Sequence, residues 1–184
     1  MCAHCHSLLI RRDLDLKSLG RVAQLKEDIS PIQQGAIGVF KEVPFVVVGR
    51  LQLKYEGGYW SEWHIALADG RSGWLSESMG ECMVSFKTPY ETAPPSMDTL
   101  EPGASVLINH EEFTVKTIDH ASIYSAEGEL PEEVSLGEQT TLVDLVKPGG
   151  SFATLDYGEE PPTLYLGEYT KVDQLKMTGL KIGR

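Results

Sequence analysis

Three side chains able to do chemistry alternate along one short stretch, Trp60, Glu62 and His64. Alternate residues of a β-strand project from the same face, so a strand over 59–67 would present an indole, a carboxylate and an imidazole in a row. The indole offers a flat platform for a cation, the carboxylate a negative charge, and the imidazole a group that titrates near neutral pH. We therefore predict that this face binds a ligand or a partner.

The opposite face of the same strand would carry Trp63, Ile65 and Leu67, which predicts that it packs against the core. A second strand should return after the Asp-Gly turn signal that follows, and it would bring Trp74 and Glu77 near the binding face. The predicted site is therefore built from two adjacent strands.

Two other functions remain open for this stretch. Glu62 and His64 could serve a hydrolase-like enzyme if they converge in a cleft between two modules. Alternatively, Trp60 is buried between the modules and the protein is purely a structural scaffold. The sequence contains none of the common phosphate-loop, dinucleotide, zinc-protease or nucleophile-elbow motifs, so no catalytic residue is predicted.

A half metal site opens the chain. Cys2 and Cys5 have the spacing of one side of a zinc knuckle, but a structural zinc ion needs four ligands and no second CxxC pair follows. Residues outside this sequence could complete the site, a partner chain could complete it, or the pair could be an inert remnant. No cofactor other than this zinc ion is indicated. The third cysteine, Cys82, lies in a strand pattern that favours a small core residue.

The elements needed to position these residues are mostly strands. An extended arm and a short helix over 18–27 come first, and Ser30-Pro31 ends them. Apolar, β-branched runs with glycine punctuation then predict strands over 36–40, 44–53 and 81–86. The fold class is therefore predicted to be all-β.

The second half of the chain resembles the first at an offset of 68 residues. Gly35–Val39 falls on Gly103–Leu107, and Phe45–Val47 falls on Phe113–Val115. This internal repeat predicts two related antiparallel modules, each a bent sheet or a partly open barrel. The predicted domains are a half knuckle with its arm and helix (1–30), a first module (31–88), a proline-rich linker (89–100), a second module (101–177) and a tail (178–184).

The charge is strongly asymmetric. The net charge is −11, and residues 91–184 carry all of it, with seventeen acidic and six basic side chains. This balance repels polyphosphates and argues against nucleic acid, whereas a small cationic ligand or a protein partner would be accepted. The sequence contains no apolar run of membrane-spanning length and no signal-peptide pattern, and the odd number of cysteines suits a reducing compartment. We therefore predict a cytoplasmic location; the sequence indicates no oligomeric state.

The sequence resembles the bacterial DUF4178 family, a domain of unknown function, over about residues 30–177. The motifs that carry the resemblance are Gly49-Arg50, Trp60-x-Glu62-Trp63, Asp69-Gly70, Trp74-Leu75-x-Glu77, Glu127–Pro131, Ala153–Leu155 and Tyr165–Tyr169. Members often carry two CxxC pairs before the domain, which implies that this sequence begins inside the knuckle.

The resemblance implies no reaction and no catalytic residues. Genes of the family often neighbour those of membrane-remodelling proteins and polyamine-related enzymes. This association implies a cytoplasmic accessory in envelope stress or polyamine-linked physiology. The function predicted from residues and resemblance together is a non-enzymatic binding or adaptor module.

Overall fold

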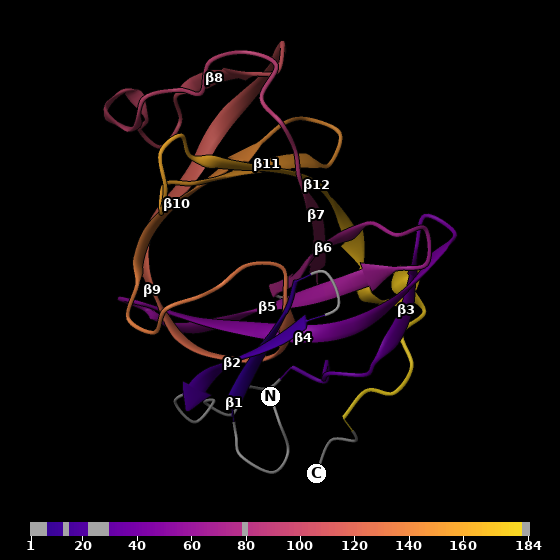
Figure 1. Ribbon diagram of the computed structural model, residues 1–184. Coiled ribbons are helices and arrows are strands. Elements are labelled where there is room, and N and C mark those ends of the chain that lie inside the picture. The colour runs from indigo at the N-terminus through magenta and orange to yellow at the C-terminus, as the bar shows by residue number, and fades with distance from the viewer. Residues whose placement is uncertain (1–6, 13–14, 22–29, 79–80, 182–184) are drawn as a thin grey trace.

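The computed structural model describes residues 7–12, 15–21, 30–78 and 81–181, which form an all-β structure (Figure 1). The strands are β1 (Ser7–Arg12), β2 (Asp15–Arg21), β3 (Ile37–Phe40), β4 (Val43–Tyr55), β5 (Gly58–Leu67), β6 (Ser72–Ser78), β7 (Glu81–Lys87), β8 (Ser105–Ile108), β9 (Glu111–Leu130), β10 (Gln139–Val146), β11 (Ser151–Asp156) and β12 (Thr163–Lys171). Only two short 3₁₀ turns, η1 (Met97–Thr99) and η2 (Val172–Leu175), are helical in this part of the chain.

The two halves repeat one order of antiparallel pairing. Strands β3 to β7 pair consecutively, and β8 to β12 do the same. Both halves begin with a hairpin whose two turn residues have positive φ, Lys41 and Glu42 in the first (47° and 67°) and Asn109 and His110 in the second (46° and 66°). Positive φ at both central residues is the turn geometry that matches the twist of paired strands. The origin of this similarity by duplication stays a prediction.

The prediction of two separate modules is wrong, because both halves close into a single barrel. Strand β12 pairs with β7, and β9 pairs with β4, so that eight strands form a ring in the order β4-β5-β6-β7-β12-β11-β10-β9. Figure 1 shows this ring, with β8 and β3 lying outside it. Long β4 and β9 make the closure, since each pairs along one part with its own half and along another part with the opposite half.

Two glycines permit the close approach of β4 and β9. Gly49 is paired with Gly128. A Cβ atom on Gly49 would lie 2.0 Å from the carbonyl oxygen of Glu129, and one on Gly128 would lie 2.2 Å from that of Val48. Gly128 also has a φ of +75°, which side chains rarely adopt. The Gly49-Arg50 pair of the sequence therefore marks the barrel seam.

The apolar residues form two main clusters, one for each half. The first includes Trp63, Ile65 and Leu67, as predicted for that face of β5, together with the buried thiol of Cys82. The guanidinium of Arg50 lies 4.7 Å from the centre of the Trp63 ring, a cation-π contact. The second cluster contains buried residues of β8 to β12.

The segments outside the barrel differ from the sequence expectations. The predicted helix over 18–27 is not supported: residues 18–21 belong to β2, and the remainder lies outside the described residues. Strand β2 pairs with β1, which runs parallel to β9. The predicted linker over 89–100 packs Tyr90, Met97 and Leu100 onto the second cluster. In the predicted tail, Thr178 exchanges two backbone hydrogen bonds with Ile37. No helix among the described residues is long and apolar enough to cross a membrane.

Candidate ligand site in the barrel lumen

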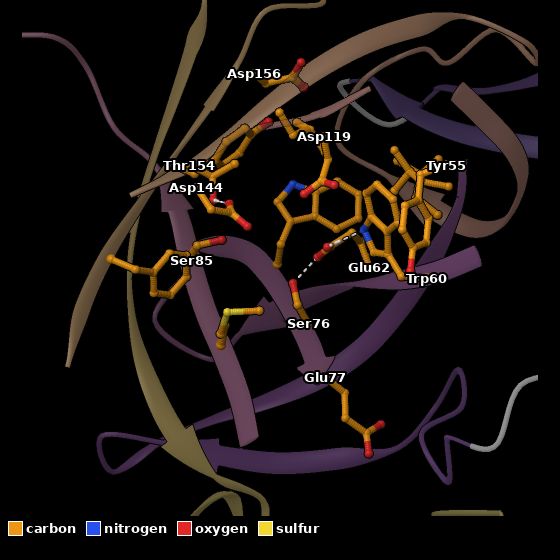
Figure 2. A pocket seen from close by; sticks show the side chains of 17 residues that line it. Tyr55, Trp60, Glu62, Ser76, Glu77, Ser85, Asp119, Asp144, Thr154 and Asp156 are labelled. Atoms are coloured by element: carbon orange, nitrogen blue, oxygen red, sulfur yellow. Dashed lines mark hydrogen bonds between the residues drawn. The ribbon is translucent and has the colours of Figure 1, made fainter. Parts of the chain in front are cut away.

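The barrel encloses a cavity of about 440 Å³, a size suited to a small molecule. Every strand of the ring contributes to it, because inward-facing residues alternate along each one (Figure 2). Among the described residues, its lining contains five carboxylates and no lysine, arginine or histidine. The lining residues are Leu51, Leu53, Tyr55, Trp60, Glu62, Trp74, Ser76, Glu77, Met83, Ser85, Asp119, Leu142, Asp144, Phe152, Thr154, Asp156 and Tyr165.

Glu62 lies on the lumen side of β5 between two hydrogen-bond donors (Figure 2). The indole Nε1 of Trp60 donates to its Oε1 at 3.0 Å, and the hydroxyl of Ser76 donates to its Oε2. Burial raises the pKa of Glu62 from 4.5 to about 7, and the nearby charge of Asp144 acts in the same direction against the two hydrogen bonds. Near neutral pH, this carboxyl group is therefore close to equal populations of its charged and neutral forms.

Asp144 comes from β10 and shares the cavity with Glu62. The hydroxyl of Thr154 donates to its Oδ1 at 2.7 Å. Burial raises the pKa of Asp144, the charge of Asp119 raises it further, and Lys116, which is outside the lining, lowers it. Several acids thus line one cavity, and its described lining residues supply no positive charge to neutralise them.

Aromatic rings form much of the remaining wall. Tyr55 and Trp60 meet edge to face with their ring centres 5.1 Å apart. Further round the ring, the indole of Trp74 on β6 donates to the hydroxyl of Tyr165 on β12. Burial raises the pKa of that hydroxyl, and so do the neighbouring acids Asp156 and Glu132. Rings of this kind provide π faces that attract cations.

The structure separates the three residues that strand alternation placed together. Trp60 and Glu62 line the lumen, but His64 does not. The residue is only 7% exposed and its Nδ1 donates to the carbonyl of Glu129 at 2.8 Å. The centre of its ring lies 5.4 Å from the centre of the Trp74 ring. Burial lowers the pKa of His64 against that hydrogen bond. The β4–β5 register shift between Val47 and Gly49 falls beside this residue, which pairs with Gly49.

The other predicted site residues have different outcomes. Trp74 and Glu77 both contribute to the lining. Figure 2 shows Glu77 turned away from Glu62 and Asp144, and its Oε2 accepts a hydrogen bond from Ser30 at 2.6 Å. Cys2 and Cys5 lie outside the described residues, so the zinc prediction stays untested. The part of the chain that the structure describes contains no group of three or more potential metal ligands.

Sequence reasoning missed the half of the lumen that β9 to β12 supply. Asp119, Asp144, Asp156 and Tyr165 come from that half. One usable signal was present: Asp144 interrupts the apolar pattern of Leu142, Val143 and Leu145. Because aspartate is rarely buried without a partner, an aspartate in such a strand indicates a functional position. The closure that brings it opposite Glu62 could not be read from local pattern.

Fold and cavity together define a closed eight-stranded β-barrel with an acidic, aromatic-lined lumen. The chain belongs to the DUF4178 family, whose model is described as a domain of unknown function and matches residues 33–172. Comparisons with curated proteins and with solved structures find no match.

Proposed function

We propose that this protein is a non-enzymatic binding module whose barrel lumen holds a small organic cation. The observation that carries the proposal is the lining: five carboxylates and five aromatic rings, with no cationic side chain among the described lining residues. A buried carboxylate is costly unless it is paired or protonated. A bound cation would supply the missing charge, and the rings would supply apolar and cation-π contact.

The alternatives have less support. A hydrolase-like enzyme needs Glu62 and His64 to converge, yet His64 lies off the lining and uses its Nδ1 on the backbone. A pure scaffold gives no reason for carboxylates around an internal cavity of this volume. A cytoplasmic setting, which the sequence favours, and a link to envelope stress or polyamine-related systems, which depends on the family resemblance alone, both belong to the proposal.

Calorimetric titration with 1-butylamine, 1-butanol and butyrate tests the proposal, because these probes share a size and differ in charge. We expect butylamine to bind and the neutral and anionic probes to fail. Binding should weaken as the pH falls from 8 to 6, since a cation favours ionised Glu62 and protonation near pH 7 opposes it.

Paired variants locate the binding. A Glu62→Gln/Asp144→Asn variant should lose at least about tenfold in affinity, equivalent to about 1.4 kcal/mol. A Glu101→Gln/Glu160→Gln variant removes the same charge from residues outside the lining and should bind as the parent does. Equal binding of all three probes, or no binding of butylamine at millimolar concentration, would refute the proposal.

A further inference from the structure

A second, smaller chamber adjoins the main cavity. This outer chamber has a volume of about 130 Å³ and shares Leu51, Leu53, Trp74, Asp156 and Tyr165 with the lumen. Four of these shared residues are apolar or aromatic. We call these five shared residues the waist. Apart from the carboxylate of Asp156 and the hydroxyl of Tyr165, they offer apolar contact to a hydrocarbon chain.

The wall of the outer chamber comes from the β9–β10 connection and the β11–β12 turn. Val134, in the first of these, packs against Ala126 and Leu130, as do Leu51 and Trp74 of the waist. The rest of its lining combines four acidic residues with apolar Ile123, Leu130 and Pro131, and lysine, arginine and histidine are absent from its described lining. The acidic residues found only in this chamber are Glu132, Glu133, Glu138 and Glu159.

Not all of these outer acids are equally available. Glu132 already forms an ion pair with Lys87, and Glu138 accepts a hydrogen bond from the backbone of Ser135 at 3.2 Å. Glu133 and Glu159 line the chamber and are exposed, so they can reach a cationic group that enters it. The main cavity contains Glu62 and Asp144.

We propose that the ligand of this lumen is a linear dication: two ammonium groups joined by an unbranched apolar chain. One ammonium group lies against Glu62 and Asp144, the chain crosses the waist beside Trp74, and the second ammonium group lies in the outer chamber near Glu133 and Glu159. This inference rests on the proposed function, because it names the class of cation that the lumen takes. Two observations carry it: carboxylates line both chambers, and four of the five residues that the chambers share are apolar or aromatic.

A homologous series of probes tests the inference. Titrations at pH 8 in 0.15 M salt would compare α,ω-diaminoalkanes of three to eight carbons with monoalkylamines of the same length. A symmetric diamine gains twofold merely from its two equivalent ends. We expect at least a tenfold advantage over the matched monoamine, with an optimum at one chain length set by the waist.

Variants of the outer chamber separate this inference from the proposed function. Glu133→Gln/Glu159→Gln should weaken diamine binding roughly four- to twentyfold, since an exposed ion pair contributes about two- to fivefold, and should leave monoamine binding unchanged. Glu101→Gln/Glu160→Gln, with the same charge change away from both chambers, should leave both unchanged.

Each outcome decides the matter. Monoamine binding with a diamine advantage of twofold or less would overturn the dication and leave the proposed function standing. A diamine advantage that survives Glu133→Gln/Glu159→Gln would overturn the placing of the second ammonium group near these two residues in the outer chamber. Failure of every amine to bind would overturn the proposed function itself.

Discussion

Replacing Glu62 by glutamine should make the protein more stable at alkaline pH. Its carboxyl pKa is raised from 4.5 to about 7 in the folded protein, so the folded state holds the proton more tightly than the unfolded chain does. The stability that this group contributes is therefore complete below pH 4.5 and is lost as the pH rises through 7. A shift of this size costs the parent about 2.5 kcal/mol of unfolding free energy between pH 5 and pH 8.

Glutamine suits the site because it resembles the protonated acid in shape. Its amide oxygen can accept from Trp60, and its NH₂ group can donate to the hydroxyl of Ser76, which now points at a carboxylate oxygen. The variant therefore removes the ionisable group without leaving the two donors unmatched. Its unfolding free energy should approach that of the parent at pH 5 and exceed it by about 2.5 kcal/mol at pH 8.

Urea denaturation at half-unit pH intervals measures this effect, in the absence of amines. The difference between Glu62→Gln and the parent isolates Glu62 from Asp144 and other titrating groups. Glu101→Gln, at an exposed position, controls for the loss of one negative charge. A difference curve that is flat from pH 5 to pH 8, or that falls with rising pH, would refute the assignment of Glu62 as a buried acid of raised pKa.

Two further predictions concern the seam and the core thiol. Gly49→Ala should lower the unfolding free energy measured by urea denaturation by more than about 3 kcal/mol, because the new Cβ atom would lie 2.0 Å from a backbone oxygen. The control Gly158→Ala, whose nearest contact is at 3.2 Å, should lower it by less than about 1 kcal/mol. Equal losses would argue against a close approach of β4 and β9 at Gly49. Burial, aided by Glu77, raises the pKa of Cys82 from 9.0 to about 11. In a Cys2→Ser/Cys5→Ser background, its reaction with iodoacetamide at pH 8 should be about 100-fold slower than that of a free thiol, and a rate equal to that of glutathione would contradict this.

The sequence predicted the local elements well because strands and tight turns depend on neighbouring residues. The expected strand over 59–67 corresponds to β5, and the turn at Asp69-Gly70 joins it to β6. Alternation correctly assigned Trp63 to the core and placed Glu62 on the opposite side. The predicted helix over 18–27 is not supported in its first four residues, Gly20 among them, because these belong to β2.

Closure of the barrel was beyond local reasoning because it joins strands far apart in the chain. Strand alternation gives the face of a residue but not the strand that it will oppose, and pairing β9 with β4 requires two glycines to meet, Gly49 and Gly128. The same limit explains the wrong placement of His64 in the predicted site. Strand alternation puts it on the face of Glu62, but in the structure its imidazole is bound to the backbone carbonyl of Glu129.

By itself, therefore, the sequence determined an all-β chain, its turns, its acidic character and one wall of the site. Only the tertiary structure decided that this wall faces Asp144 across an enclosed lumen and that an outer acidic chamber adjoins it. The physical reason is that the pKa of a buried carboxyl group depends on the groups around it. For Glu62 these groups include residues of strands about eighty residues further along the chain.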